Sequence, residues 1–419
     1  MLRRLRQPYR RILFVIIVFL IVFFFVFLFL NIYNNYRIKH ALINVELKDD
    51  LNVEVYSKVK LSDLITKING KLIEDKEINT TRLGKQQIQF EYINEENLTI
   101  PYSIEIKVVD KTPPIISQYN TKEVYVGDKD FKKTLFCGDN YDNKPKCIIK
   151  GEYDINTPGT YLLTFTGIDS SNNISNHNFN LIVKEKPKSS KSSTNTNVVS
   201  NSNIFNNSIS FSKIKKEYKN KNTKIGIDIS KWQGDINYKQ VKKAGVDFAI
   251  IKLGGRDGKD GDLYLDKNYK KNIEGFNKVN IPVGVYFYSH AKNKEEALEE
   301  AKFVIKNIKK YGVSLPIAFD WENFDTYRSY NLSFYNLTEV AKTFMSYIES
   351  KDHEAMLYGS KYTLENYWYE TDYKTWLAHY TDKTDYKGKY YLWQMTDKGK
   401  VKGINDNVVD IDIMYDKKN

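Results

Sequence analysis

The sequence has few of the residues that build metal centres and crosslinks. It contains two cysteines and five histidines in 419 residues, and no histidine lies near Cys137 or Cys147 in the chain. We therefore expect no metal site and no cofactor. A disulfide between Cys137 and Cys147 and a pair of free thiols both remain open, because cysteine spacing alone does not separate them.

The sequence also lacks a concentrated basic tract. Its 64 Lys and Arg residues are spread along the chain and, set against 52 Asp and Glu residues, give a formal net charge of +12. Such a charge favours contact with polyanions and says nothing about fold. Nucleic acid, anionic lipid and an acidic wall polymer all fit it.

Residues 12–30 lack any charged residue or proline. At about 1.5 Å of rise per residue, this run is long enough for the bilayer core, which needs about 20 apolar residues. A secretory signal peptide is the alternative, but its apolar region has about 7 to 15 residues and ends in small residues. Here "NIYNNY" follows. We predict an uncleaved transmembrane helix over residues 12–32.

The arginines before this helix set its direction. Residues 1–11 contain Arg3, Arg4, Arg6, Arg10 and Arg11. The positive-inside rule then predicts a cytoplasmic N-terminus, a single crossing of the cell membrane, and an extracellular remainder. This placement disfavours nucleic acid as a partner and favours an anionic wall polymer or membrane surface. It also permits a disulfide.

Two blocks of short alternating runs follow, at residues 37–110 and 111–185. Runs such as "KQQIQFEYI", "YSIEIKVVD", "TYLLTFTGID" and "FNLIVKE" alternate apolar and polar residues between turn residues. This pattern predicts antiparallel strands with one solvated face. The blocks read as repeats, because each places a glycine turn before a long strand and ends on an edge strand. Each is predicted to be a small β-sandwich.

The second block resembles the bacterial immunoglobulin-like domains of Gram-positive surface proteins. The resemblance rests on "DKTPPII", "VYVGD", "NTPGTYLLTFTGIDSSNN" and the closing "LIVK". It implies a spacer or a weak adhesion module. Residues 186–222, which follow, are rich in Ser, Asn and Lys and nearly free of aromatic residues, so we predict a disordered linker there.

Residues 223–419 change to alternating strand and helix patterns. Eight strand-like runs, from "KIGIDIS" to "VVDIDIMY", alternate with four helical ones, and the last strands are joined by loops. Alternation of this kind predicts a parallel sheet, and eight strands predict closure into a barrel. The fold class predicted for the chain is therefore multidomain: a transmembrane helix, two β-sandwich (Ig-like) domains and an α/β modified TIM-like (β/α) barrel.

Acidic residues fall at the ends of barrel strands, where loops converge on the axis. They are Asp228, Asp320, Glu322 and Asp410. Asp320 and Glu322 are two residues apart, so both can face the interior, with Trp321 between them pointing outward. Crowded carboxyls in a desolvated site have raised pKa values, which supplies the protonated and ionised pair that a glycosidase needs. Ordinary loop or capping acids are the alternative, and two acids in step within an apolar strand disfavour it.

Aromatic residues gather at the same strand ends and suit stacking on sugar faces. They are Trp232, Tyr286, Tyr288, Trp376, Tyr380 and Trp393. Of these, we expect Trp232, Tyr286 and Trp393 in particular to line a cleft.

These segments together resemble a known family. In order and spacing, "GIDISKWQG", "AGVDFAIIKLG", "PIAFDWE", "LYGSKY" and "LWQMTDKGKVKGINDNVVDID" are similar to the glycoside hydrolase family 25 lysozymes, which are N-acetylmuramidases. The resemblance covers residues 224–415. It implies a barrel whose last strands lack helices, and a retaining endo-hydrolase that cuts the β-1,4 bond between N-acetylmuramic acid and N-acetylglucosamine in peptidoglycan glycan strands.

The resemblance also implies residue roles. Glu322 corresponds to the general acid/base, and Asp320 to a nucleophile or to an acid that orients and stabilises the substrate acetamide. Asp228 and Asp410 complete the cluster, and the "WQM" segment with Gln394 forms a cleft wall.

Two other functions fit parts of this pattern. A non-catalytic wall-binding or assembly scaffold would keep the sugar cleft without turnover, but the four intact acids disfavour it. A chitinase-like hydrolase also ends a strand in Asp-x-Glu, but it usually carries a longer acidic ladder, and here Ala318 and Phe319 precede Asp320.

Overall fold

The computed structural model describes residues 7–186, 208–405 and 408–415. The chain divides into two compact units, Met1–Lys111 and Thr112–Asn419. Most of the predicted cytoplasmic segment over residues 1–11 and of the predicted linker over residues 186–222 lies outside the described residues.

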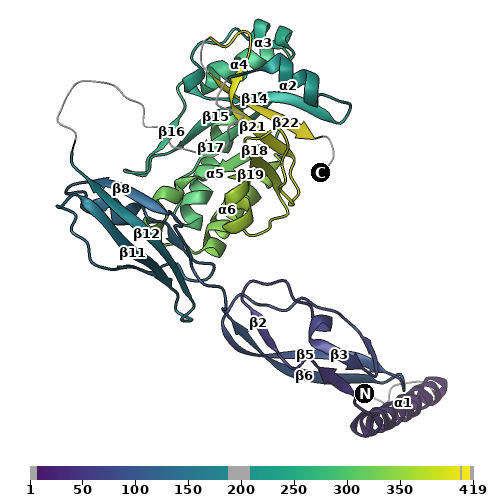
Figure 1. The fold of residues 1–419 in the computed structure, drawn as a ribbon. Helices are drawn as coiled ribbons and strands as arrows, with labels where there is room; N and C mark the ends of the chain where they lie inside the picture. The colour runs from purple at the N-terminus through teal and green to yellow at the C-terminus, as the bar shows by residue number, and fades with distance from the viewer. Residues whose placement is uncertain (1–6, 187–207, 406–407, 416–419) are drawn as a thin grey trace. The chain divides into compact units, whose positions relative to one another are not determined.

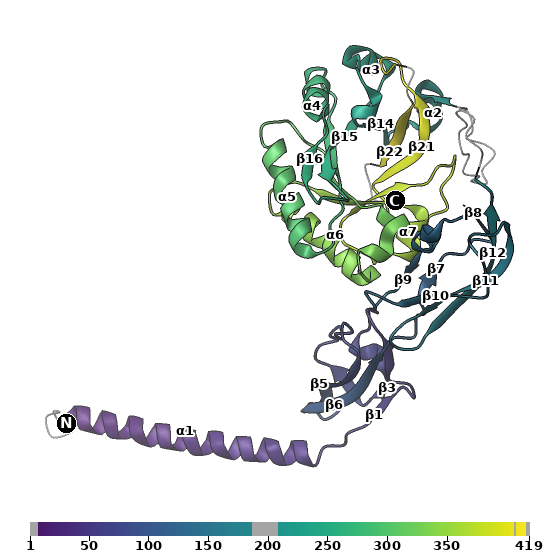
Figure 2. The same ribbon diagram turned by 90° about the vertical axis from the view of Figure 1, so that its left-hand side faces the viewer.

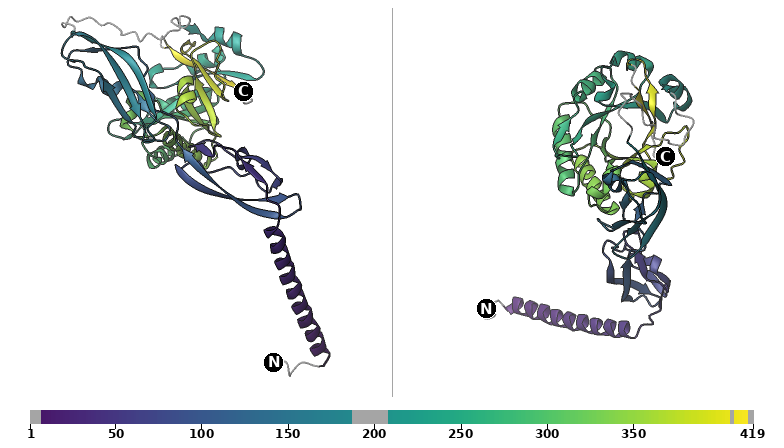
Figure 3. Two further views of the ribbon diagram at one scale, coloured as in Figure 1. Left: turned by 60° about the horizontal axis from the view of Figure 1, so that its bottom comes forward. Right: turned by 60° about the vertical axis from the view of Figure 1, so that its left-hand side comes forward.

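The first unit begins with α1, Gln7–Lys39, a single continuous helix (Figure 3). Its stretch Arg11–Lys39 is long and apolar enough to cross a membrane, by length and composition. The helix contains the predicted span over residues 12–32 and continues beyond it, because no proline or glycine interrupts the polar residues that follow.

A first β-block follows α1. Its strands are β1 Val45–Leu47, β2 Asn52–Glu54, β3 Ile65–Ile68, β4 Gly70–Leu72, β5 Gly84–Asn94 and β6 Thr99–Val109. The strands β2, β6, β5 and β4 form one sheet in that order, and β1 pairs with β3. The long hairpin of β5 and β6 buries alternate residues, among them Tyr92, Ile104 and Ile106, as the period of two predicts.

The second unit begins with a second β-block. Its strands are β7 Ile115–Ile116, β8 Thr121–Tyr125, β9 Cys137–Gly138, β10 Lys146–Lys150, β11 Gly159–Ile168 and β12 Ile174–Lys184 (Figure 1). Both blocks share one pairing scheme. In the first, β2 runs parallel to β6 and the β5–β6 hairpin continues to β4. In the second, β8 runs parallel to β12 and the β11–β12 hairpin continues to β10. The Ig-like class of the two blocks stays a prediction.

A closed barrel forms the rest of the second unit. Its strands are β14 Thr223–Ile229, β15 Ala249–Arg256, β17 Val283–Tyr288, β18 Ile317–Asp320, β19 Ala355–Ser360, β20 Lys374–Ala378, β21 Leu392–Lys400 and β22 Val409–Tyr415. Each strand pairs with the next, and β22 pairs with both β21 and β14, which closes the ring. A short strand, β16 Leu263–Leu265, pairs only with β15.

One barrel strand departs from the predicted parallel sheet. The seven ring strands β14, β15, β17, β18, β19, β20 and β21 run parallel to one another. The eighth, β22, is antiparallel to both of its neighbours. A parallel β22 would need a crossover of about a dozen residues or more, and only residues 401–408 separate it from β21.

Residues 379–391, between β20 and β21, contain no helix, and elsewhere helices lie around the ring of strands (Figure 2). They are α3 Tyr238–Ala244, α4 Tyr269–Lys278, α5 Lys294–Ile308, α6 Phe334–Glu349 and α7 Lys361–Asn366. Outward side chains of the strands pack on the helices in the largest core cluster. Inward side chains such as Phe248, Ile250, Met356 and Met414 form a separate apolar filling of the barrel.

The linker prediction is wrong for its last part. Ile209–Ser210 forms β13, which pairs in parallel with β21, and Phe211–Tyr218 forms helix α2. Phe211 and Ile214 lie three residues apart on one helix face and are buried in the main core. Burial of Phe211 and Ile214 in this core attaches the short helix to the barrel, although the surrounding residues have the composition of a linker. The folded domain therefore begins near residue 209 and not at residue 223.

Candidate active site

The four acids predicted from the sequence lie at one end of the barrel. Asp228 is near the end of β14, Asp320 ends β18, and Glu322 follows it. Asp410 instead lies at the start of β22. Because β22 is antiparallel, its start meets the end of β14, and Asp410 and Asp228 are direct partners in the strand pairing. The predicted strand direction at Asp410 is wrong, and the predicted barrel end is correct.

Asp228, Asp410 and Asp412 form a cluster of carboxyl groups. Asp228 is the direct pairing partner of Asp410 on β22, and Asp412 follows Asp410 by two residues on the same strand. Burial, followed by the charge of Asp412, raises the pKa of Asp228 well above its usual value. Burial and the charge of Asp228 raise the pKa of Asp410 to about 9. Burial and the charge of Asp410 raise the pKa of Asp412 to about 8. This cluster holds protons at neutral pH.

Asp320 and Glu322 form a second acidic group beside a lysine. Asp320 is buried, and its Oδ1 has no hydrogen-bond partner among the described residues. Burial and the charge of Glu322 raise the pKa of Asp320, while the Lys252 ammonium lowers it. The side chain of Glu322 is exposed. The surrounding protein nevertheless desolvates its carboxyl group and raises the pKa of Glu322, while the charge of Lys252 opposes this rise.

Lys252 lies on β15 among aromatic rings. Its Nζ is 4.5 Å from the centre of the Tyr288 ring and 5.7 Å from that of Tyr286. Burial lowers the pKa of this ammonium, and the charge of Asp320 is the largest opposing influence, ahead of that of Glu322. The positive charge of Lys252 therefore acts mainly on Asp320.

Gln394 connects the carboxyl cluster to the aromatic wall. Its Nε2 donates to Asp228 Oδ2 at 2.9 Å, and its Oε1 accepts from the hydroxyls of Tyr358 at 2.9 Å and Tyr380 at 3.1 Å. Trp376 acts similarly on the other side, because its Nε1 donates to Asp412 Oδ1 at 2.8 Å. These bonds fix the orientation of the acids before any substrate arrives.

The predicted aromatic residues lie in three places: at the acidic end of the barrel, on the turn after β14, and, for Trp393, in the outer core. Tyr286, Tyr288, Trp376 and Tyr380 lie at the acidic end, where the charges of the acids raise the pKa of each tyrosine after burial. Trp232 lies on the turn after β14 and is 73% exposed.

The prediction for Trp393 is wrong. Its ring is buried in the outer core, and its Nε1 donates to the His379 carbonyl at 2.8 Å. Since Gln394 points inward, the residue before it must point outward. Trp321 packs outward, as expected, with its Nε1 donating to the Ala291 carbonyl at 3.2 Å.

Three site residues escaped the sequence prediction: Asp412, Lys252 and Tyr358. Each could have been found by the period of two. Asp412 follows Asp410 by two residues, and Lys252 follows the inward Ile250 in the same way. A charged residue inside an apolar strand is the signal for Asp412 and Lys252, and Tyr358 follows the inward Met356 by two residues on β19.

Comparison with known proteins finds similarity to one family of glycosyl hydrolases. Residues 227–404 match the model for glycosyl hydrolases family 25. The chain is 25% identical over 187 residues to an autolytic lysozyme of Clostridium acetobutylicum, an alignment that covers 43% of this chain and 52% of that protein. It is 33% identical over 82 residues to Lysozyme M1 of Streptomyces globisporus, covering 20% of this chain and 26% of that protein.

Solved structures give a similar match. The modular autolysin LytC from Streptococcus pneumoniae, in complex with a synthetic peptidoglycan ligand, is 29% identical with a TM-score of 0.40, over 46% of this chain and 47% of that chain. The chain thus spans about half the length, or less, of these relatives.

Proposed function

We propose that this protein is a peptidoglycan hydrolase of the lysozyme type, because residues 227–404 match the model for glycosyl hydrolases family 25. The observation that carries the proposal is the pairing of Asp320 with Glu322 at one end of the barrel, beside the half-buried ammonium group of Lys252. The bond cleaved is the β-1,4 bond between N-acetylmuramic acid and N-acetylglucosamine.

The two acids divide the work according to their surroundings. Glu322 is open to solvent and has a raised pKa, so it can be protonated and can reach the glycosidic oxygen of a bound glycan. We assign Asp320 as the anionic partner: burial and Glu322 raise its pKa well above the usual value, and the Lys252 ammonium, whose charge acts on Asp320 more than on Glu322, is the group that favours its ionised form. Asp320 acts on the opposite charge that develops at the sugar, either as nucleophile or by orienting the substrate acetamide, with retention at the anomeric carbon.

The other acids hold the site in place. Asp228, Asp410 and Asp412 share protons, and their bonds to Gln394 and Trp376 set the positions of wall residues. Tyr286, Tyr288, Tyr380 and Trp232 are the candidates for stacking on sugar rings.

The protein acts outside the cell while held to its membrane. Helix α1 serves as a single-pass anchor, and the arginines before it keep the N-terminus in the cytoplasm. The β-blocks lie between this anchor and the barrel in the sequence, which places the enzyme domain on the wall side of the membrane. The net charge of +12 suits a wall that carries anionic polymers.

A turbidity assay tests this function. Purified peptidoglycan should lose turbidity and release muropeptides with the wild-type protein. Glu322→Gln keeps the side-chain volume and removes the proton donor, so its rate should fall by about a hundredfold or more. If wild type and variant were equally inactive on several wall preparations, the barrel would be a binding scaffold and the proposed enzyme would be excluded.

A further inference from the structure

The position of Glu322 depends on an aromatic cluster just behind it. The short helix η5, Asn323–Ser329, begins directly after Glu322. Trp321, on the other side of Glu322, is 1% exposed, and its ring packs edge-on against Phe324, Tyr327 and Tyr330 at centroid distances of 5.1, 6.0 and 5.0 Å. Any shift of η5 therefore moves the backbone that carries the acid pair.

The second β-block supplies a ring to this same cluster. Phe136 lies 5.3 Å from Tyr327, 4.8 Å from Tyr367 and 6.3 Å from Phe334, measured between ring centroids. It packs against the core cluster of the barrel and not against that of its own block. Phe136 is thus a residue of the β-block that completes the core of the barrel.

Polar contacts from Asp139 and Asn143, which follow Phe136 in the chain, strengthen this attachment. The Phe334 amide donates to the Asp139 carbonyl at 2.8 Å. Asn143 Oδ1 accepts from the Ser333 amide at 2.8 Å and from Asn336 Nδ2 at 2.7 Å, at the first turn of α6.

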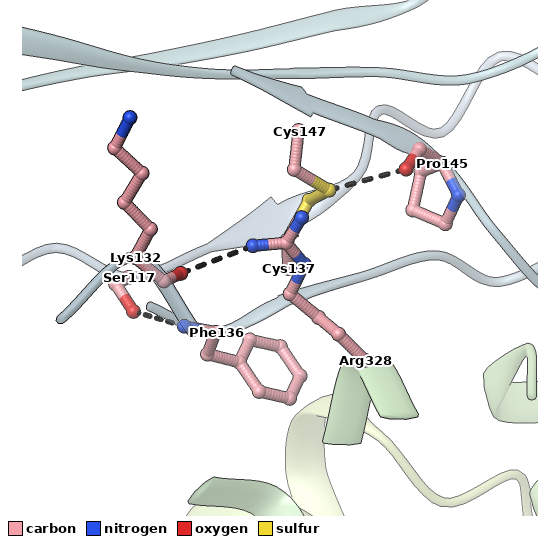
Figure 4. Close-up of a disulfide and its surroundings, with 7 residues drawn as sticks. All are labelled: Ser117, Lys132, Phe136, Cys137, Pro145, Cys147 and Arg328. Atoms are coloured by element: carbon pink, nitrogen blue, oxygen red, sulfur yellow. Dashed lines mark hydrogen bonds between the residues drawn. A yellow bond between two sulfur atoms is a disulfide. The ribbon is translucent and has the colours of Figure 1, made fainter. Parts of the chain in front are cut away.

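Arg328, within η5 itself, reaches back to the β-block. Its Nη1 donates to the Lys132 carbonyl at 3.2 Å (Figure 4). The two surfaces also approach closely at Gly138, where an added Cβ would lie 2.7 Å from the Phe334 ring and 2.8 Å from the Tyr327 ring. Only glycine permits this approach.

The disulfide secures the segment that carries Phe136. Cys137, the next residue, is bonded to Cys147 of β10, and the Phe136 amide donates to Ser117 Oγ at 2.6 Å. Figure 4 shows the Phe136 ring on the barrel side of the disulfide. The segment is tied to two neighbouring parts of its own block while its ring enters the barrel core.

We propose that the second β-block is required for full activity. Its residue Phe136 is a positioning residue, because it holds η5 and thereby sets the position of Glu322. This inference rests on the proposed hydrolase function and adds to it. A mere spacer would contact the barrel through solvated side chains and would need neither the half-buried Phe136 ring nor Gly138.

The test compares the kinetics of full-length variants in detergent on soluble peptidoglycan fragments. Phe136→Ala should lower kcat by about tenfold to a hundredfold with KM little changed, because a shift of about 1 Å at a reacting group costs this much. Asn143→Ala keeps every ring contact and should lower kcat less. Tyr125→Ala, an aromatic truncation on the exposed side of the same block, is the matched control and should match wild type. Phe136→Leu should restore part of the loss.

The pH profile separates positioning from a general loss of folded protein. Desolvation raises the pKa of Glu322, so a displaced η5 that admits water should lower this pKa. The alkaline limb of kcat/KM, which reports the protonated acid, should then move to lower pH in Phe136→Ala and stay fixed in Tyr125→Ala. Unfolding alone would reduce the amplitude of the profile and leave its limbs in place.

Two failures are distinguishable. If wild type releases no muropeptides, the proposed function fails. If wild type is active and Phe136→Ala matches it in kcat and in pH profile, the positioning role of the β-block is refuted while the hydrolase function stands.

Discussion

Asp412 offers a prediction that links the acid cluster to stability. It is fully buried, and burial together with Asp410 raises its pKa from 3.8 to about 8. Between these two values the folded protein keeps a proton that the unfolded chain has lost. The sign follows: the raised pKa favours folding at low pH, and this contribution disappears as pH rises toward 8.

The magnitude comes from one proton. Each proton held only by the folded state makes the free energy of unfolding fall by about 1.4 kcal/mol per pH unit. Between pH 5 and pH 7 this amounts to about 2.7 kcal/mol. Asp412→Asn keeps the acceptor for Trp376 Nε1 and offers an amide donor toward Asp228, but it does not titrate. From pH 5 to pH 7, the unfolding free energy of the Asp412→Asn variant should therefore fall by about 2.7 kcal/mol less than that of the wild type.

Urea unfolding monitored by tryptophan fluorescence suits this test, because the five tryptophans all lie in the barrel. Wild type, Asp412→Asn and the exposed control Asp372→Asn should be compared at pH 5, 6 and 7. The slopes of unfolding free energy against pH for wild type and Asp412→Asn should differ by about one proton. The control should keep the wild-type slope. If Asp412→Asn also kept it, Asp412 would be ionised in the folded protein, and our description of the cluster would be wrong.

Other substitutions test further parts of the site. Asp320→Asn should lower kcat on glycan fragments by about a hundredfold to a thousandfold while their dissociation constant changes little; equal losses in both would count against a catalytic role. Trp393→Phe should leave kcat unchanged and lower the unfolding free energy by about 1 kcal/mol, through the lost bond to His379; a large loss of kcat would return Trp393 to the cleft. Gly226→Ala places a Cβ 2.5 Å from the Phe248 ring and should cost about 1 to 3 kcal/mol in urea unfolding, and a neutral result would mean that the barrel floor is loosely packed.

Period-two reasoning predicted much of the barrel. It gave the inward direction of Asp320 with Trp321 turned outward, while the eight ring strands followed from apolar runs that alternate with helical patterns. The same rule, applied to every strand, would have found Asp412 and Lys252 and would have excluded Trp393. The ring of Trp393 suits a sugar cleft by its chemistry, but its phase on β21 turns it outward.

Other features depended on long-range contacts that no local pattern carries. The direction of β22 is set by its pairing with β14 and β21. Helix α2 forms because Phe211 finds the barrel core, in a segment whose composition is that of a linker. The place of Phe136 in that core is likewise invisible in a sequence that reads as an independent β-sandwich.

The identity of the new reducing ends tests the central claim most directly. Peptidoglycan digested by the wild-type protein would be reduced with borohydride and analysed by mass spectrometry. The account predicts reduced N-acetylmuramic acid at the new ends, and no new ends with Glu322→Gln. Reduced N-acetylglucosamine at those ends would contradict it.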